Sequence, residues 1–489
     1  MTSPTDHVEI RPGAYADSVT LLQVSRDVAA TPGVVAAQVA MATPLNVEVL
    51  GSMGFAVPDC SPNDLVVALR LADPDGLEAA RGAVDAALAA ARAGRADRST
   101  AVAPPRTTRT SLPASGTQAV LALVSVPGAH AFVEAIDALD AGCDVMVFSD
   151  NVSLEQEVAL KQVAVDRGLL VMGPDCGTAA IGGVGLGFAN TVRPGPVGIV
   201  AASGTGCQQV MCLLEAAGVG VGAALGVGGR DLSTEVGAIS TRTALLRLDS
   251  DPAIERVLVV SKPPAPEVAT ALEEYAASLA TPIDLALLGP GQPDLTSAVE
   301  GLLGRLGVPV PSWPSCGHPA TETAGSLLRG LFVGGTLCDE AMLIATEALG
   351  PIRSNIPLEP ELALDASLTA DGHLMVDFGD DSLTRGRAHP MIDPTVRLDH
   401  LARAAADPRT GVVLLDVVLG HGAEADPAAA LAPAIAACGP PVVVACVGTE
   451  SDPQVLSRQA AALAAAGAEV HLSNAAAVRR AVAILGGRR

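Results

Sequence analysis

Between residues 117 and 489, short apolar runs alternate with longer alanine-rich stretches of helical periodicity. The runs "DVMVFSD", "PVGIVAAS", "VLVVS", "GVVLLDVVLG" and "PVVVACVG" are rich in Val, Leu and Ile. Strands that are apolar on both faces and alternate with helices are typical of parallel sheets covered by helices on both sides. The sequence therefore predicts an α/β protein with several doubly wound parallel-sheet domains of Rossmann or flavodoxin-like type.

The first 95 residues follow a different order. "HVEIRPGAYA", "VVAAQVAMAT" and "DLVVALRLAD" read as strands, with helices after the first and the third. This β-α-β-β-α order is typical of a small α+β domain of ferredoxin-like type. Proline-rich segments indicate two linkers. The expected organisation is an N-terminal α+β domain (1–95), a linker (96–116), a Rossmann domain (117–195), a flavodoxin-type domain (196–306), a second linker (307–329) and a C-terminal α/β domain (330–489).

Charge and cysteine usage exclude several classes of function. Acidic residues outnumber basic ones by 53 to 30, and the net charge of −23 argues against nucleic acid as a partner. The nine cysteines include no CxxC pair and no Cys/His cluster at zinc spacing, so we expect reduced thiols and no metal site. The sequence shows no secretory signal and no apolar run of about 18 residues, which predicts a cytoplasmic protein without a membrane partner.

Ligands of doubly wound sheets bind at the carboxyl ends of the strands, and two such turns combine glycines with polar residues. In "MGPDCGTAAIGGVGLG", Asp175 and Cys176 lie beside glycines that let backbone N–H groups approach an anion. In "GIVAASGTGCQQV", a strand leads into a helix start suited to a phosphate or a carboxylate, formed by Ser203, Gly204, Thr205 and Gly206. The alternatives are a tight turn without chemistry and a simple helix N-cap.

A third strand end, "ALGVGGRDLS", carries Gly228, Gly229, Arg230 and Asp231. Arg230 is suited to binding an oxyanion, and it is equally suited to pairing with Asp231. Lys262, which follows the strand "VLVVS", is another candidate anion ligand. The chain contains only one further lysine and no GK[ST] sequence, and it lacks a GxGxxG turn with its acidic partner, so standard nucleotide-binding loops are not predicted.

The stretch "MVDFGDDSLTRGRAHPMIDP", residues 375–394, gathers both charge signs and a histidine between glycines. Its arginines are suited to holding a carboxylate or a phosphate, its histidine to moving a proton, and its aspartates to orienting either. Surface salt bridges and a turn at the His-Pro pair are the alternative. The candidate catalytic residues are Asp380, Asp381, Arg385, Arg387 and His389.

Several phrases carry a resemblance to known families. "VFSDNVSLEQEVALKQVAVDRGLLVMGPDCGTA", "GPVGIVAASGTGCQQV" and "GVGGRD" resemble the α-subunit of succinyl-CoA synthetase across residues 115–305. "SPNDLVVALR", "RGLFVGGTLCDEAM", "DFGDDSLTRGRAHPMIDP" and "LLDVVLGHGAEADPAAAL" are similar to the FdrA family over essentially the whole chain. The resemblance implies the succinyl-CoA-synthetase architecture, with a CoA-binding-like domain at 117–195 and ligase-CoA-like domains at 196–306 and 330–489.

The resemblance implies two activities. The first is that of a carbamoyltransferase subunit, which with companion subunits phosphorolyses a ureido acid of the oxalurate type to an oxamate-type amide acid and carbamoyl phosphate. It needs phosphate as co-substrate and no cofactor. The alternative is an acyl-CoA synthetase that uses ATP and CoA. Succinyl-CoA synthetase carries phosphate on the histidine of a GHAGA-type loop, and the corresponding region here has only His318, in "SCGHPAT". This favours the carbamoyltransferase; a scaffolding subunit of a heteromeric complex is a third possibility. We expect an oligomer.

Overall fold

The alternation of strands and helices produces parallel sheets in the computed structural model, which describes residues 5–14, 16, 18–93, 107–112, 120–320, 323–384 and 387–486. The chain divides into two units. The first is formed by Met1–Ser115 with the short segments Ser125–His130 and Arg385–Ala388, and the second by Gly116–Val124, Ala131–Thr384 and His389–Arg489. In the described residues no helix combines the length and the apolar character needed to cross a bilayer.

The N-terminal part of the first unit is a three-stranded antiparallel sheet with strand order β1-β3-β2. Alternate residues of β3 face opposite sides: Val67 packs against α1 and α3, whereas Val66 packs against Leu50 of α2. The short helix α2 was not expected; it begins after the N-cap Thr43. The elements are β1 (Thr5–Arg11), α1 (Ser18–Ala29), β2 (Val34–Met41), α2 (Pro44–Ser52), β3 (Leu65–Leu71), a 3-10 turn η1 (Pro74–Gly76), α3 (Leu77–Ala93) and the short α4 (Thr108–Ser111).

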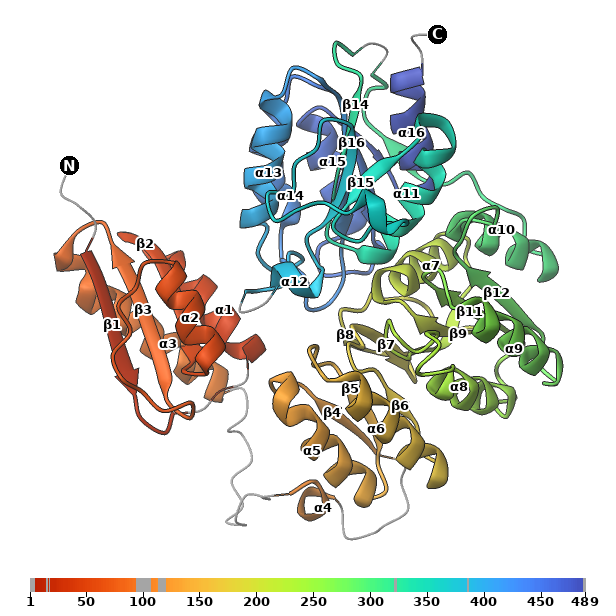
Figure 1. Cartoon of the computed structure of the whole chain (residues 1–489), viewed down its shortest axis with the longest axis horizontal. Helices are drawn as coiled ribbons and strands as arrows, with labels where there is room; N and C mark the ends of the chain where they lie inside the picture. Colours follow the sequence, from red (N-terminus) through yellow and green to blue (C-terminus); the bar gives the residue numbers. More distant parts are fainter. Residues whose placement is uncertain are drawn as a thin grey trace. The chain divides into compact units, whose positions relative to one another are not determined.

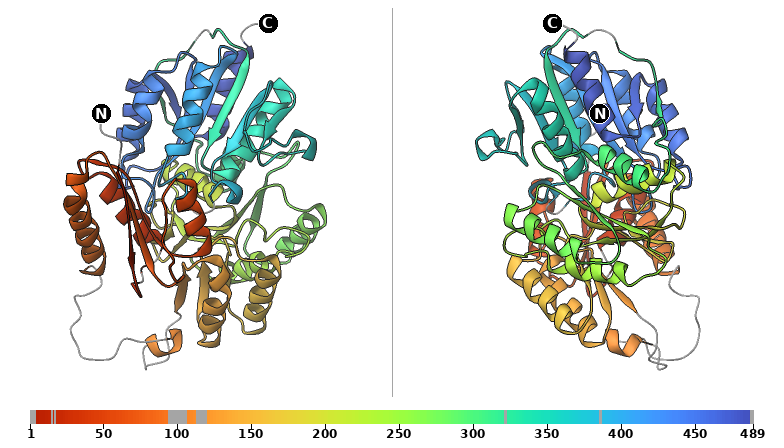
Figure 2. Two further views of the ribbon diagram at one scale, coloured as in Figure 1. Left: turned by 60° about the vertical axis from the view of Figure 1, so that its left-hand side comes forward. Right: turned by 90° about the vertical axis from the view of Figure 1, so that its right-hand side faces the viewer.

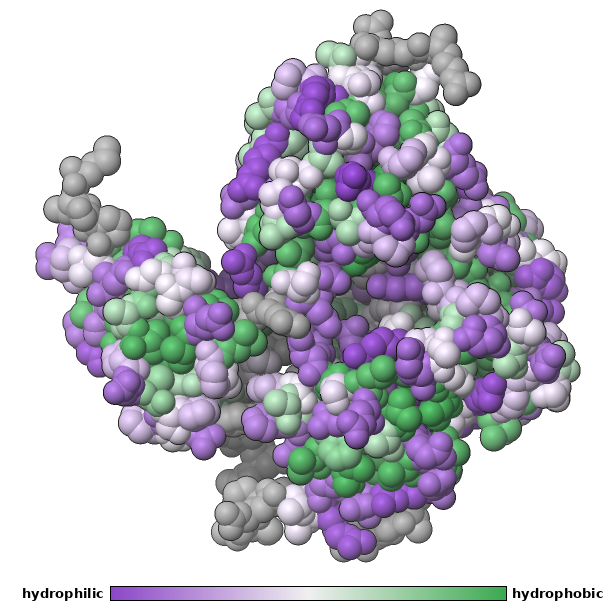
Figure 3. All heavy atoms as spheres, in the orientation of Figure 1, coloured by the Kyte–Doolittle hydropathy of each residue, from purple (hydrophilic) through white to green (hydrophobic). Residues whose placement is uncertain are grey.

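The second unit contains three sheets that follow one another along the chain, coloured orange, yellow to green, and teal to blue (Figures 1 and 2). The smallest is parallel, with strand order β4-β5-β6. Leu123 and Val133 of this region are exposed, and hydrophobic residues reach the surface over β4 and α5 in Figure 3. Its elements are β4 (Leu121–Val124), α5 (Gly128–Asp140), β5 (Asp144–Val147), α6 (Leu154–Asp166) and β6 (Val171–Met172).

The first lobe, as we call the second sheet with its helices, has the strand order β12-β11-β9-β10-β7-β8. Strands β9 to β12 are parallel, and the hairpin β7–β8 extends the sheet by pairing antiparallel with β10. This hairpin lies in the segment expected to belong to the preceding Rossmann domain. The elements are β7 (Thr178–Ile181), β8 (Val184–Gly187), β9 (Val197–Ala202), α7 (Gly204–Ala216), β10 (Val221–Gly226), α8 (Ile239–Asp249), β11 (Arg256–Ser261), α9 (Pro266–Ala277), β12 (Ile283–Leu287) and α10 (Leu295–Arg305).

The second lobe is built on the third sheet, with the order β13-β19-β18-β17-β14-β16-β15, in which only β13 is antiparallel to its neighbour. Its elements are β13 (Ser315–Cys316), β14 (Leu327–Phe332), α11 (Gly335–Leu349), β15 (Ile352–Ser354), a 3-10 turn η2 (Pro360–Leu362), β16 (His373–Asp377), α12 (Asp381–Thr384), α13 (Thr395–Ala406), β17 (Thr410–Val418), α14 (Pro427–Ala436), β18 (Val442–Val447), α15 (Leu456–Ala465), β19 (Ala468–His471) and α16 (Asn474–Gly486). The predicted α/β class, with parallel sheets and a small N-terminal α+β domain, is confirmed.

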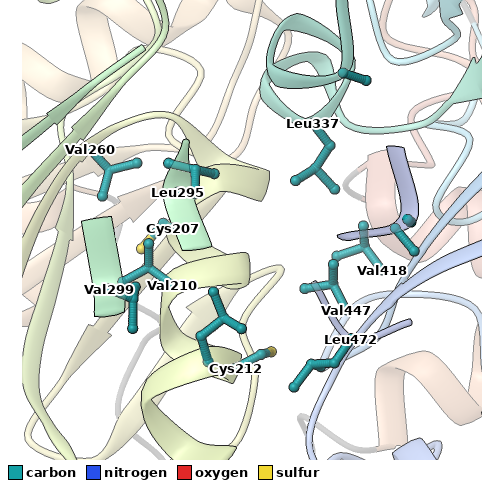
Figure 4. Close-up of a cluster of buried hydrophobic side chains, with 14 of the residues drawn as sticks. Cys207, Val210, Cys212, Val260, Leu295, Val299, Leu337, Val418, Val447 and Leu472 are labelled. Carbon is teal, nitrogen blue, oxygen red and sulfur yellow. The ribbon is translucent and has the colours of Figure 1, made fainter. Parts of the chain in front are cut away.

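One hydrophobic core is shared by the two lobes. Helix α7 is buried on all sides from Gly206 to Leu214, and its two buried glutamines, Gln208 and Gln209, donate hydrogen bonds to carbonyl groups of the second lobe. Figure 4 shows Cys207 and Val210 of α7 beside Leu295 and Val299 of α10, and Cys212 facing Leu472 of the second lobe. The lobes are therefore held together by apolar packing along α7.

Candidate functional site

The two lobes repeat one structural motif at the strand ends that face each other. The sequence "SGTGCQQVM", 203–211, opens α7, and "GGTLCDEAM", 334–342, opens α11. In the neighbouring strands, Gly226 of β10 pairs with Ala201, just as Asp377 of β16 pairs with Phe332. In the first lobe, the N–H of the next residue, Val227, donates to the carbonyl of Ala201 at 2.8 Å. In the second lobe, the N–H of Phe378 donates to the carbonyl of Phe332, also at 2.8 Å. Gly226 and Asp377 therefore occupy equivalent positions.

The first turns of α7 and α11 are in direct contact. Ser203 Oγ accepts a hydrogen bond from the backbone N–H of Gly206 as the N-cap of α7, and it donates to Thr336 Oγ1 at 2.6 Å. A Cβ atom on Gly334 would lie 2.7 Å from Thr205 Oγ1, so this close approach requires glycine. The N-termini of α7 and α11 therefore converge, and the positive ends of the two helix dipoles favour an anion beside them.

Lys262 follows β11 and brings a positive charge to the first turn of α11. Its side chain is 39 % exposed, and its Nζ lies 3.9 Å from Asp339 Oδ2. A Cβ atom on Gly335 would lie 2.9 Å from Lys262 Nζ and 2.7 Å from Asp377 Oδ2. Burial opposes the charge of the lysine, but Asp339 and Asp377 outweigh this effect, so the pKa of Lys262 is above its usual value.

Three carboxyl groups surround this lysine. Burial raises the pKa of Asp377 to about 7 and that of Asp339 to about 6, while Lys262 opposes both shifts. Asp175, in the turn after β6, has its backbone in the left-handed region with φ of 56°. Its side chain is exposed to water, yet protein surrounds it closely enough to raise its pKa to about 7, and the charge of Asp381 contributes to this shift. At neutral pH the site therefore exchanges protons readily.

Asp416 of β17 supports the turn between β14 and α11 from within the sheet. Its carboxylate accepts hydrogen bonds from the N–H groups of Val333 at 2.8 Å and Gly334 at 2.9 Å, and from Arg397 Nη1 at 3.1 Å. The carboxylate is fully buried, and the Arg397 side chain is nearly so. This pair fixes the orientation of the α11 N-terminus.

His389 lies at the edge of the site with a defined tautomer. Its Nδ1 accepts the N–H of Met391 at 3.2 Å, and burial lowers its pKa to about 4. A neutral imidazole whose Nδ1 accepts a hydrogen bond carries its proton on Nε2. A Cβ atom on Gly379 would lie 2.8 Å from this Nε2 and 3.1 Å from Asp377 Oδ1, which places the histidine as a donor close to the aspartate.

The charged residues of the third predicted turn bond to other parts of the fold. Arg230 donates to Glu157 Oε2 at 2.9 Å and to the carbonyl of Val152. Asp231 accepts from the buried Lys161 at 2.7 Å and from the first turn of α8. This network ties α6 to α8. A Cβ atom on Gly228 would lie 2.4 Å from the carbonyl oxygen of Pro174, so this glycine permits close packing beneath the Asp175 turn. A Cβ atom on Gly229 would make an ordinary contact, 3.9 Å from Asp175 Oδ2.

The other predicted site residues are distributed as follows. The Cys176 thiol is buried and donates to the carbonyl of Thr178, and burial raises its pKa far above the usual range, which makes it a poor nucleophile. Asp380 accepts the N–H of Ser382 at 3.0 Å and so caps α12, while Asp381 is exposed in the first turn of that helix. Arg387 is exposed, and Arg385 lies outside the described residues.

The structure thus brings the helix start Ser203–Gly206, Lys262, Asp175 and His389 to the facing strand ends of the two lobes. Sequence reasoning did not select Asp339, Asp377 or Thr336. The repeated pattern of Gly-Thr, Cys and Met in α7 and α11 is the signal that could have identified them, because a duplicated helix start indicates a shared site. Within the described parts of the chain, no cluster of three or more His, Cys, Asp or Glu residues could hold a metal ion.

Family models, curated proteins and solved structures show similarity to parts of this chain. Two family models match: "CoA-ligase" at residues 331–484 and "AllF, heavy metal-associated domain" at residues 1–104. The chain is 26 % identical over 243 residues to succinate–CoA ligase [ADP-forming] subunit alpha 2 of Archaeoglobus fulgidus, which spans 48 % of this chain and 73 % of that protein. The acetyl-coenzyme A synthetase 1 structure from Ca. Korarchaeum cryptofilum aligns with 80 % of this chain and 86 % of its own, at 16 % identity and a TM-score of 0.32.

A relative of nearly the same extent is the uncharacterized protein YahF of Escherichia coli strain K12. It is 37 % identical over 444 residues, which cover 86 % of this chain and 85 % of YahF. The similarity therefore extends over most of both chains. The chain belongs to the FdrA family, whose members are similar to the α-subunit of succinyl-CoA synthetase.

Proposed function

We propose that this chain is a subunit of a carbamoyltransferase that phosphorolyses a ureido acid of the oxalurate type. The products are an oxamate-type amide acid and carbamoyl phosphate, phosphate is the co-substrate, and no further cofactor takes part. Companion subunits complete the enzyme. The observation that carries the proposal is the convergence of two helix N-termini beside Lys262, Asp339 and Asp377.

The helix N-termini and the lysine support the binding of small anions. Phosphate and the carboxylate of a ureido acid both need N–H donors and positive potential, and the first turns of α7 and α11 supply these together with Lys262. Holding two reacting anions in one fixed geometry accounts for much of the rate that such a transfer requires.

The neighbouring carboxyl groups indicate that the substrate carries N–H groups. Asp339 and Asp377 are 7 % and 3 % exposed. Among the described residues no hydrogen-bond donor reaches Asp377 Oδ2, and the only partner of Asp339 is the distant Lys262. These oxygens can therefore accept hydrogen bonds from a ligand, and hydrogen bonds from N–H groups to a carboxylate are among the strong ones in proteins. Amide and ureido groups supply such N–H groups, whereas a bare phosphate does not.

The tautomer of His389 favours carbamoyl transfer over a phosphohistidine mechanism. Its Nδ1 accepts the N–H of Met391, so Nε2 carries the proton and has no free lone pair for attack on phosphorus. A neutral Nε2–H group is instead suited to donating a hydrogen bond to the oxyanion that forms when phosphate adds to a carbamoyl carbon.

An acyl-CoA synthetase is the second candidate, and the comparisons favour it. The CoA-ligase family model covers most of the second lobe, and the named enzymes among the relatives are CoA ligases. That reaction would need ATP, CoA and a group that carries phosphate. Both candidates pass through an anhydride of phosphate with a carbonyl carbon, so the same helix N-termini serve either reaction.

A phosphorus NMR time course tests the proposal. The protein, alone and as the complex with its companion subunits, is given oxalurate and inorganic phosphate. We expect a carbamoyl phosphate resonance without nucleotide or CoA, and its loss in the Lys262→Met variant. Arg305→Met, which removes a surface cation that pairs with Asp284, is the matched control and should stay active.

Two results would overturn the proposal. Release of phosphate from ATP that depends on CoA and a carboxylic acid, with no reaction of oxalurate, would establish the ligase. Full activity of the Lys262→Met complex would mean that the companion subunits hold the active site and that this chain is a scaffold.

A further inference from the structure

We infer that Asp377 is the acid–base residue of this site: its carboxyl group protonates the nitrogen that leaves the carbamoyl carbon. The inference rests on the proposed carbamoyl transfer and extends it to a residue and an atom. Asp377 lies at the end of β16, in the third sheet of the second unit.

The comparison of the two lobes indicates that this carboxyl group is not needed for the local fold. The equivalent position of the first lobe is Gly226, with the same strand pairing and the same following hydrogen bond. Asp339 likewise corresponds to Gln208 in the repeated helix start. The first lobe thus uses uncharged residues where the second lobe carries acids. The strand pairing at this position therefore forms without a carboxyl group in the first lobe, which leaves the carboxyl group of Asp377 available for chemistry.

The geometry directs one carboxyl oxygen toward the anion position. Asp377 Oδ1 accepts the N–H of Gly379 at 2.9 Å, which fixes the rotation of the group. Oδ2 has no hydrogen-bond partner in the described chain, and it would lie 2.7 Å from a Cβ atom on Gly335, the first residue of α11. Asp377 Oδ2 and Lys262 Nζ thus fill the space beside Gly335 where a side chain would otherwise lie. A ligand that binds at the α11 N-terminus therefore meets both atoms.

The charged groups around Asp377 leave it able to gain and lose a proton. Lys262 faces it from the end of β11, Asp339 from α11, Asp416 from β17, and the neutral His389 from the loop after α12. Burial raises its pKa to about 7, Lys262 opposes the rise, and the two other aspartates add to it. A pKa near the working pH is what general acid–base catalysis requires.

The proposed step conserves atoms and charge. A phosphate oxygen of HPO₄²⁻ forms a bond to the carbamoyl carbon, and the bond between that carbon and the imide nitrogen breaks. Its electron pair stays on the nitrogen, which takes the proton from Asp377 Oδ2. The Asp377 carboxylate then takes the proton that the phosphate brought. The products are the neutral amide and carbamoyl phosphate, and Asp377 has returned to its starting state.

The test uses the complete complex with oxalurate and phosphate. We expect Asp377→Asn to lower kcat by about 100-fold or more, the usual contribution of a general acid, and to abolish the pH dependence of kcat near pH 7. The affinity for inorganic phosphate, measured by calorimetry, should change by less than about threefold because the helix N-termini and Lys262 remain. Asp371→Asn, which alters an exposed aspartate paired with Arg409, is the matched control.

Asp377→Gly is the second variant, since it installs the residue that the first lobe uses at the equivalent strand position, and it should fold and lose activity equally. Retention of kcat in either variant would overturn the role of Asp377. A loss of phosphate affinity as large as the loss of kcat would also overturn it, because the residue would then act in binding. If the wild-type complex makes no carbamoyl phosphate, the proposed function itself fails, whatever the variants do.

Discussion

The hydroxyl group of Ser203 donates a hydrogen bond to Thr336 Oγ1 at 2.6 Å and so joins two helix starts that lie 133 residues apart in the chain. The same oxygen caps α7 through the N–H of Gly206. One atom therefore stabilises a helix end and aligns it with its counterpart in the other lobe.

Ser203→Ala removes both interactions. We expect the free energy of unfolding to fall by about 2 kcal/mol, about 1 for the cap and about 1 for the buried hydrogen bond. Ser153→Ala is the matched control, because Ser153 caps α6 without a second partner, and it should cost about 1 kcal/mol. Urea unfolding of the three proteins gives the comparison. Equal losses in the two variants would show that the link to Thr336 contributes nothing.

Gly335→Ala tests the space at the start of α11. The new methyl group would lie within 3 Å of Asp377 Oδ2 and Lys262 Nζ, whose side chains must move away. We expect a folded protein whose affinity for inorganic phosphate falls at least tenfold, measured by calorimetry. Gly304→Ala in α10 meets no atom within 4 Å and should leave the affinity unchanged. Tight phosphate binding by the Gly335 variant would place the anion elsewhere.

The pKa of Asp339 gives stability a defined pH dependence. In the folded protein this pKa is raised from 3.8 to about 6 by burial, so the folded state binds its proton more tightly. The resulting stability is fully present below the unfolded pKa and is lost as the pH rises through about 6. Between pH 5.5 and pH 8 the loss is about 1 kcal/mol.

Asp339→Asn never ionises, so its melting temperature should rise relative to wild type as the pH increases over this range. Thermal melts at both pH values measure the difference, and Asp371→Asn, which alters an exposed residue, should show none. A relative decrease for the Asp339 variant would mean that its pairing with Lys262 outweighs burial.

Asp416 and Arg397 form a buried pair, and removing one member leaves the other unpaired. Asp416→Asn should lower the free energy of unfolding by about 3 kcal/mol or more, and Arg397→Met should do likewise. The double variant should lose clearly less than the sum, because no isolated charge remains. The exposed pair of Arg409 and Asp371 provides the control cycle, with a coupling below about 1 kcal/mol. Additive losses in the Asp416 cycle would contradict the geometry.

The sequence predicted the strands and helices well because their signals are local. The apolar run "PVGIVAAS" and the Ser-Gly-Thr-Gly start of α7 lie within a few residues of each other, and the structure places them as β9 and the capped helix. The short helix α2 was missed because its apolar residues pack on the far side of the N-terminal sheet, which only the tertiary fold reveals.

The site was harder to predict because its members are long-range partners. Arg230 and Asp231 have the residue types of an anion site, but the buried Lys161 and Glu157, about 70 residues earlier, engage them. Asp377 lies in the charged stretch that the sequence singled out, but the sequence-based interpretation gave Asp380 and Asp381 the role of orienting the histidine or the substrate. Only the tertiary structure, which places Asp377 Oδ2 and Lys262 Nζ next to Gly335, reveals that the two residues lie close together.

The shared core along α7 has a consequence for how ligands enter. A hinge motion that separated the lobes would expose buried apolar side chains on both sides of this helix to water. Each Å² of apolar surface exposed in this way costs about 25 cal/mol of free energy. The walls of the anion site are therefore rigid before any ligand arrives, and binding requires little ordering of the protein. Small molecules with few atoms can bind such a preorganised site usefully, without separation of the lobes.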